Sequence, residues 1–340
     1  MYSESDVDDA VAAGALSANA AARLRGHVAA RRGAPAVDEE QFRLLTGFND
    51  IFVAIAIALL LAAVAGLGRI VAAGLAGAAV AGTAWLLAEY FTARRRMALP
   101  SILLLLAFVG GIAAAGVGTL IDIRTELSGR GGALAASGVA ALTAGAAWLH
   151  WRRFQVPITV AAGAVAVVAV LAGLVDAAAP ELDEAIWALA LVAGIAVFAL
   201  AIRWDLSDRE RRTKRSDVAF WLHLAAAPLI AHSVFRLLGV LGGEVGVGSA
   251  LLVLALYVLF AAVALAVDRR ALLVSGLAYV LYALIALFRS AGALELSWAF
   301  TALVIGSALL TLSAFWQPMR RAVVTRLGGL GHRLPPVATA

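Results

Sequence analysis

Ten hydrophobic stretches, each long enough to cross a bilayer, occupy most of the chain between Asn49 and Trp316. A helix needs about 20 mostly apolar residues to cross the hydrocarbon layer, which is roughly 30 Å thick. The stretches cover residues 50–67, 70–91, 100–121, 132–151, 156–176, 185–203, 217–240, 248–267, 271–289 and 296–316. Hydrophobic residues make up 63% of the 340 residues and charged residues 14%, more apolar surface than a soluble core would bury. We therefore predict an all-α, polytopic membrane protein with about ten transmembrane helices.

The first two stretches are separated only by the short sequence from Gly66 to Arg69. Read as one helix, they would form a rod of about 40 residues and nearly 60 Å, twice the hydrocarbon thickness. Tilting does not absorb such a mismatch. The sequence therefore predicts a helical hairpin that turns at residues 66–69.

Arginine placement tests the number of spans independently, because short loops rich in Lys and Arg stay on the cytoplasmic side. With the N-terminus inside, all but five of the 27 basic residues fall in cytoplasmic segments. The five others belong to outer loops or to outer ends of spans: Arg69, Arg124, Arg130, Arg236 and Arg289. We predict that both termini are cytoplasmic. The composition is rich in Arg and Ala, with Lys214 as the single lysine, and it indicates a bacterial inner membrane.

The chain divides into three predicted parts. Residues 1–48 form a cytoplasmic helical hairpin, with a break at Gly14 and a cap at Ser17, followed by an amphipathic lead-in. Residues 49–316 form the ten-span domain, and residues 317–340 a basic, flexible cytoplasmic tail. The hairpin is too small for a core of its own, so we expect it to dock on the membrane domain or on a protein partner.

Membrane lipids are the other predicted partners. The basic pI of about 10.2 follows from arginines that lie beside anionic headgroups of the inner leaflet. These arginines form no helical basic face interleaved with aromatic residues, so we predict no nucleic-acid binding.

Arg-Arg pairs recur in four of the cytoplasmic turns, at residues 95/96, 152/153, 211/212 and 269/270. This spacing is typical of tandem two-span hairpins, in which spans 1 and 10 flank four parallel units. Positive-inside selection acting on evenly spaced spans would give a similar period without any duplication. Both interpretations stay open at this point.

Small residues repeat at helical spacing in spans 2 and 3, which favours close helix packing in lipid. They are Ala73, Gly77 and Ala81 in span 2, and Gly111, Ala115 and Thr119 in span 3. We predict that these two faces are packing seams.

Sequence signatures of catalysis and of cofactor binding are absent. The glycine clusters lack the strand, helix and lysine of a phosphate-binding loop. The five histidines have neither an HExxH spacing nor an acid at ligand spacing, and the chain has no cysteine. We therefore predict no catalytic residues, no cofactor and no metal site, and a membrane-embedded enzyme is the least favoured class.

Ionisable residues inside spans are the remaining indication of a site, because burying one costs several kcal/mol unless it is paired or hydrated. Span 7 carries His232 and Arg236 on one face, with Pro228 near the midplane, while span 3 is weakened at Gly110 and Gly111. Interrupted helices at matching places indicate a transporter binding site. We therefore predict an outward-facing polar cavity formed by spans 3 and 7, with Asp122 or Glu126 as its acidic partner.

The alternative is that these residues serve the fold: Arg236 reaches the interface, His232 packs as a neutral group, and Pro228 is a kink. A second candidate is a proton-linked gate in which Glu89 of span 2 pairs with His223 of span 7, at similar depth. Here too there is an alternative, in which Glu89 contacts a nearby arginine among Arg94–Arg96.

The segment from Val7 to Ser17, with Ala20 to Leu24 after it, resembles the opening of a bacterial family of unknown function. The resemblance implies a polytopic inner-membrane protein with a cytoplasmic helical pair and supplies no catalytic residues. Two function classes follow. One is a non-enzymatic scaffold or sensor that acts through residues 1–48. The alternative is a transporter of a small molecule or lipid, since ten spans also resemble the plan of the drug/metabolite transporter superfamily.

Overall fold

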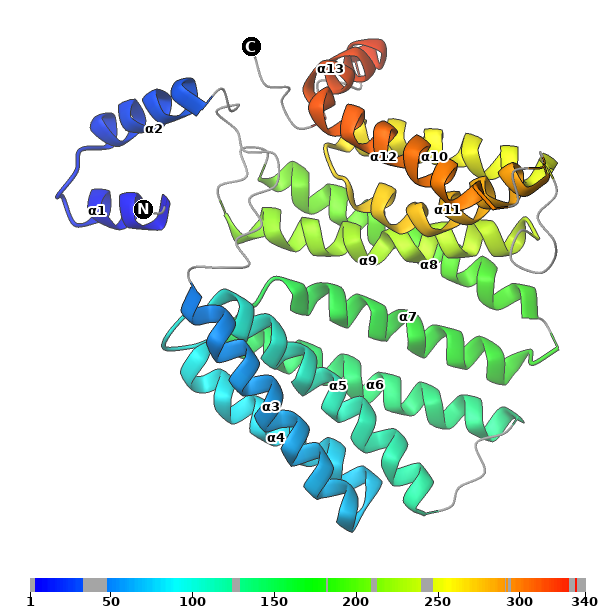
Figure 1. Ribbon diagram of the computed structural model, residues 1–340. Coiled ribbons are helices and arrows are strands. Elements are labelled where there is room, and N and C mark those ends of the chain that lie inside the picture. The colour runs from blue at the N-terminus through cyan, green and yellow to red at the C-terminus, as the bar shows by residue number, and fades with distance from the viewer. Residues whose placement is uncertain are drawn as a thin grey trace.

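The computed structural model describes residues 4–32, 48–123, 129–181, 183–208, 213–239, 247–290, 292, 295–329 and 334. All regular secondary structure in these ranges is helical (Figure 1). Two short helices come first, α1 (Glu4–Ala12) and α2 (Ala18–Arg32). Ten long helices follow: α3 (Phe48–Val71), α4 (Ala73–Phe91), α5 (Ala98–Asp122), α6 (Gly129–Phe154), α7 (Ile158–Ala178), α8 (Asp183–Ser207), α9 (Lys214–Leu237), α10 (Val247–Val267), α11 (Ala271–Ser290) and α12 (Ser297–Ala314). The last helix is α13 (Trp316–Arg326).

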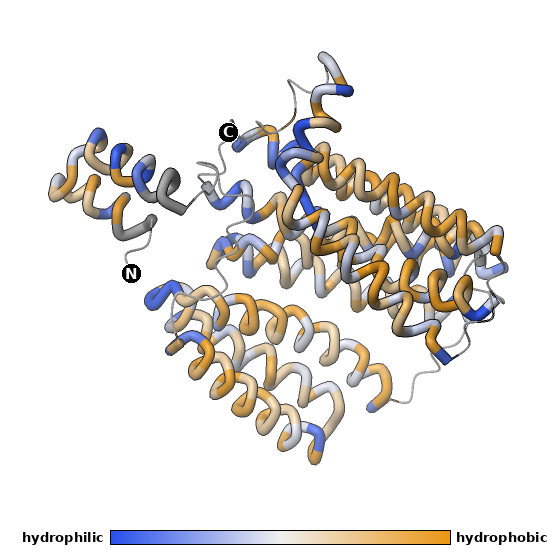
Figure 2. The backbone as a smooth tube through the Cα atoms, turned by 45° about the horizontal axis from the view of Figure 1, so that its top comes forward, coloured by the Kyte–Doolittle hydropathy of each residue, from blue (hydrophilic) through white to orange (hydrophobic). Residues whose placement is uncertain are grey.

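The helices α3 to α12 are each long and apolar enough to cross a membrane. Figure 2 shows hydrophobic residues along these helices and hydrophilic residues mainly near their ends. The prediction of an all-α protein with ten membrane spans is therefore confirmed. The connections α4–α5, α6–α7, α8–α9 and α10–α11 lie at one end of the bundle (Figure 1). Three of the Arg-Arg pairs lie in or directly before these connections, and the fourth, at residues 211/212, lies outside the described residues. We call this the basic end.

The four hairpins with turns at the basic end are the most extensively packed helix pairs of the described chain. Three of their turns share an unusual backbone feature. Among the described residues, positive φ outside glycine occurs only at Arg96 (53°), Gln155 (52°) and Asp268 (62°), and each lies between the two helices of a hairpin. A left-handed residue at this place ends the first helix and reverses the chain within a few residues.

The first two spans form a hairpin as predicted, but the turn lies later than residues 66–69. Helix α3 continues to Val71, and the break is at Ala72, whose backbone is extended (φ −163°, ψ 148°). Gly68 is part of helix α3 and does not form the turn. Its lack of a side chain lets α3 and α4 approach closely, because a Cβ there would lie 2.6 Å from Cα of Ala76. Helix α4 begins where the carboxylate of Asp122 accepts hydrogen bonds from the N–H groups of Ala73 (3.0 Å) and Gly74 (2.8 Å).

Asp122 therefore caps α4 from the far end of α5, and its removal should weaken the hairpin. The first N–H groups of a helix have no partner within it, and a carboxylate there also interacts favourably with the helix dipole. We expect Asp122→Ala to lower the free energy of unfolding by about 1–2 kcal/mol. Unfolding in mixed detergent micelles measures this loss. Asp122→Asn should lose less, because its amide oxygen still accepts; equal losses in both variants would contradict the capping role.

The predicted packing seam between spans 2 and 3 is confirmed. A Cβ at Gly77 would lie 2.2 Å from N of Ala115, and one at Gly111 would lie 2.8 Å from N of Ala81. A Cβ at Gly118 would be 2.5 Å from the carbonyl carbon of Ala73. Small residues thus let the backbones of α4 and α5 approach closely, which replaces the hydrophobic drive that lipid removes.

The segments outside the ten candidate spans differ in part from the prediction. Helices α1 and α2 pack on each other, with Gly14 at positive φ and the Ser17 hydroxyl accepting from Ala20 N–H (3.2 Å). The amphipathic lead-in lies outside the described residues. Where we predicted a flexible tail from residue 317, the structure has α13, with Trp316 3% and Arg320 0% exposed. The reason is Asp268, which accepts from Trp316 Nε1 (2.8 Å) and forms an ion pair with Arg320 (3.4 Å).

Candidate functional site

His232 of α9 lies among aromatic side chains from two other helices. The centre of its ring is 5.0 Å from that of Trp187 in α8 and 6.1 Å from that of Tyr279 in α11. Its Nδ1 is hydrogen-bonded to the Tyr279 hydroxyl. This bond uses Nδ1, so Nε2 is the ring nitrogen that we consider for contact with a ligand.

A cavity of about 250 Å³ lies beside this histidine. Its lining residues come from three helices: Val165 of α7, Trp187 and Ala190 of α8, and Ala225, Pro228, Leu229, His232 and Ser233 of α9. We call this the α7–α9 cavity. The structure therefore places Pro228 and His232, two of the predicted site residues, in one cavity wall. Pro228 is exposed and Val165 is 45% exposed, so the cavity opens on the side of the helical bundle.

Arg236 lies one helical turn beyond His232 and is exposed. Its guanidinium carbon is 5.7 Å from the ring centre of Trp187, a distance at which a cation is attracted to an aromatic face. Trp187 thus contacts both His232 and Arg236. The three side chains combine a cation, an imidazole and an indole beside an apolar cavity.

The other residues predicted for this cavity lie elsewhere. The cavity is formed by α7, α8 and α9 rather than by α5 and α9 (spans 3 and 7). Gly111 contacts Ala81 of α4, and Asp122 caps α4. Gly110 is exposed, and a Cβ built on it would meet no described atom within 4 Å. Gly111 and Asp122 thus serve the contact of α5 with α4, whereas Gly110 takes no part in it. Glu126 lies outside the described residues.

The predicted Glu89–His223 gate is not formed. Glu89 accepts two hydrogen bonds from Arg153, at 2.9 Å from Nε and 2.5 Å from Nη2. Glu89 thus contacts an arginine, as the alternative interpretation predicted. This arginine lies at the end of α6, however, and is none of Arg94–Arg96. His223 is instead engaged with Asp205 of α8, at 2.9 Å between Nε2 and Oδ2.

Asp205 is the centre of a buried charged cluster at the basic end that the sequence analysis missed. Arg269 donates to both of its carboxylate oxygens, at 2.5 and 3.3 Å, and also to the carbonyl oxygen of Ser216 (3.3 Å). Asp205, His223 and Arg269 are 2%, 1% and 4% exposed. We call these three residues the Asp205 cluster. Its sequence signal was an aspartate just after the hydrophobic stretch 185–203, two residues before the end of α8.

The two carboxylate–arginine pairs occupy equivalent positions in the chain. Glu89 and Arg153 are separated by 64 residues, and so are Asp205 and Arg269. In each case an acid near the end of a hairpin's first helix contacts an arginine in the turn region of the next hairpin. Helices α5 and α9 also begin 116 residues apart, the offset that relates the two pairs. The two pairs thus lie at matching places in the helices α4–α7 (the first half) and the helices α8–α11 (the second half).

The α7–α9 cavity lies where these halves meet. Helix α7 is the last of the first half, and α8 and α9 are the first two of the second half. In Figure 1, α7 runs between the group α3–α6 and the group α8–α12. No group of three or more histidine or acidic side chains in the described ranges could hold a metal ion.

The described structure thus belongs to the class of integral membrane proteins with ten candidate spans. Comparison of the chain with protein-family models, with curated proteins and with solved structures found no match.

Proposed function

We propose that this integral membrane protein is a transporter that binds a small, bilayer-soluble molecule in the α7–α9 cavity. The observation that carries this proposal is the position of the cavity between the two halves of the membrane domain, in which the carboxylate–arginine pair recurs at the same separation of 64 residues. In transporters built from internal repeats, substrate sites lie at the repeat interface within the membrane. Pro228, which weakens the α9 backbone ladder at this cavity, supports the same function.

The chemistry of the cavity supports a lipid-like ligand. Pro228 lies about 21 Å along α9 from Lys214, well inside the membrane-spanning part, and the cavity opens sideways there. A molecule that reaches such an opening must first partition into hydrocarbon. Apolar walls suit its hydrophobic part, and His232 Nε2 and the nearby Arg236 suit a polar or anionic group.

We also propose that the protein lies in a bacterial inner membrane with both termini in the cytoplasm, as the resemblance of residues 7–24 implies. Residues 1–48 could then act as a scaffold or sensor by binding a protein partner. In this orientation the basic end faces the cytoplasm. The α1–α2 hairpin supports the partner hypothesis only in that Leu24, an apolar residue of α2, is 47% exposed.

Filling the cavity should abolish ligand retention. Ala190 lines the cavity, whereas Ala188, on the same helix, is exposed on another face. We expect native mass spectrometry of the protein, released gently from its own membrane, to detect a bound small molecule in the wild type and in Ala188→Leu. Ala190→Leu should lose that mass, because the added side chain occupies the ligand's volume.

Arg236→Gln adds a test of ligand charge. If the ligand is anionic, the retained mass should fall in this variant while the protein stays folded. A wild type that carries no small molecule, or a mass retained equally by Ala190→Leu, would contradict the proposal and favour a scaffold acting through residues 1–48.

A further inference from the structure

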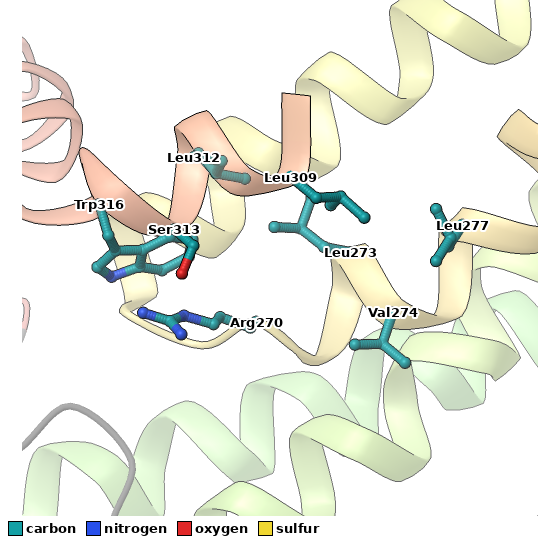
Figure 3. Close-up of a pocket in the computed structure, with 8 residues that line it drawn as sticks. All are labelled: Arg270, Leu273, Val274, Leu277, Leu309, Leu312, Ser313 and Trp316. Atoms are coloured by element: carbon teal, nitrogen blue, oxygen red, sulfur yellow. The ribbon is translucent and has the colours of Figure 1, made fainter. Parts of the chain in front are cut away.

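A second cavity, of about 150 Å³, lies at the basic end, far along the chain from the α7–α9 cavity. Figure 3 shows it as a groove between α11 and α12. Its apolar walls are Leu273, Val274 and Leu277 of α11 and Leu309 and Leu312 of α12. At one end lie Arg270, Ser313 and Trp316. The groove is therefore apolar along its length and polar at one end only.

We propose that this groove binds one anionic phospholipid, with the phosphate at Arg270 and the first part of an acyl chain between α11 and α12. The position in the membrane is the first argument. Both helices are candidate membrane spans, and Val274, on the rim, is 64% exposed, so the groove opens toward lipid. Arg270 and Leu277 are seven residues apart, which gives a groove of about 10 Å, a third of the hydrocarbon layer.

The polar end has the geometry of a headgroup site. The guanidinium carbon of Arg270 lies 4.7 Å from the ring centre of Trp316. Trp316 is itself fixed, since it is 3% exposed and its Nε1 donates to Asp268 at 2.8 Å. At this distance the cation is attracted to the indole ring, and a guanidinium carries several N–H donors in one plane, which suits a phosphate. The Ser313 hydroxyl lies on the same side of the groove (Figure 3).

Charge complementarity favours an anionic lipid over a zwitterionic one. Of the five arginines in the α10–α11 turn and α13, Arg269 and Arg320 are buried in ion pairs with Asp205 and Asp268. The positive charge at the surface here comes from the other three, Arg270, Arg321 and Arg326. Basic side chains at a membrane surface attract anionic headgroups. Tryptophan is also enriched at this depth, where the apolar ring and the polar N–H both find suitable surroundings.

The test compares two phospholipids that have the same acyl chains, phosphatidylglycerol and phosphatidylcholine, added to delipidated protein and counted by native mass spectrometry. We expect the wild type to bind the first phosphatidylglycerol about five- to tenfold more tightly than phosphatidylcholine. Arg270→Gln should remove most of this preference. Arg321→Gln is the matched control, because Arg321 is an exposed arginine of α13 outside the groove, and it should keep the preference.

Val274→Trp fills the groove without changing charge, and we expect it to lower the affinity for both lipids. Ala190→Leu, in the α7–α9 cavity, should change neither, so this site and the proposed transport site succeed or fail separately. Three results would overturn the proposal: no lipid preference in the wild type, equal losses in Arg270→Gln and Arg321→Gln, or full displacement of the lipid by inorganic phosphate alone. The last would indicate a simple anion site.

Discussion

Replacing Asp205 with alanine is expected to lower the free energy of unfolding of the membrane domain by about 3–5 kcal/mol. The carboxylate is 2% exposed and lies against both Arg269 and His223. Without it, the Arg269 guanidinium is left buried without its counter-charge. A buried pair contributes little when intact, but breaking it by removing one partner is strongly destabilising.

Glu89→Ala is the matched control, because Glu89 holds the equivalent position in the first half. Its arginine pair has similar geometry, but the side chains of Arg153 and Glu89 are 50% and 35% exposed. An exposed pair contributes about 0–1 kcal/mol, so this variant should unfold almost as the wild type does. Reversible unfolding in mixed detergent micelles, followed by circular dichroism, compares the two. Similar losses in both variants would show that burial does not set the importance of these pairs.

The double variant Asp205→Ala/Arg269→Ala separates the pair from its surroundings. Residues in direct contact have non-additive effects, and removing both charges also removes the unpaired one. We expect the double variant to lose less stability than the sum of the two single variants. An additive result would mean that each side chain acts through other contacts.

The spans were predictable because hydropathy and arginine placement are local signals that agree. Each predicted span coincides for most of its length with one helix of α3–α12. The turn between α3 and α4 was placed too early because the residue that fixes it, Asp122, is 49 positions away from Ala73, whose N–H it caps. The sequence around Gly66 and Gly68 indicated a break, whereas Gly68 in fact allows close helix contact.

The candidate site was predictable only in part, for a related reason. Polar residues inside a span, such as His232, stand out in the sequence, and the proline beside them indicates a weakened helix. A single sequence does not show which other helices pack against these residues. The cavity is lined by α7 and α8 beside α9, whereas we expected α5. Arg269 was read as a loop residue because every arginine at the basic end satisfies the same topological rule. Its buried contact with Asp205 depends on a helix 64 residues earlier.

The two carboxylate–arginine pairs bear on whether the regular spacing of the Arg-Arg pairs reflects an internal repeat. Span length alone explains why arginines recur at regular intervals. It does not explain why, in two separate places, an arginine contacts an acid that lies 64 residues earlier in the chain. The two pairs also differ, since only the second is buried and joined by a histidine. The same contact is thus exposed in the first half and buried in the second.

The second large effect is expected from Gly77→Leu in the seam between α4 and α5. Even the first added atom, Cβ, would lie 2.2 Å from the backbone nitrogen of Ala115, closer than any real contact. The helices must separate to admit it, and close packing is what holds them together in lipid. We expect the free energy of unfolding to fall by about 3 kcal/mol, at the upper end of the usual cost of overpacking.

Gly82→Leu is the control for Gly77→Leu, because it places the same side chain on another face of the same helix, α4. Gly82 is exposed, and a Cβ built there meets no described atom within 4 Å. The added leucine would face lipid, and replacing a helical glycine also removes a conformational cost of about 0.5–1 kcal/mol. Gly82→Leu should therefore be neutral or slightly stabilising in the same unfolding assay. If Gly77→Leu were equally well tolerated, close contact between the backbones of α4 and α5 would not be what holds them together. The packing role of Gly111, on the α5 side of the seam, would then also be wrong.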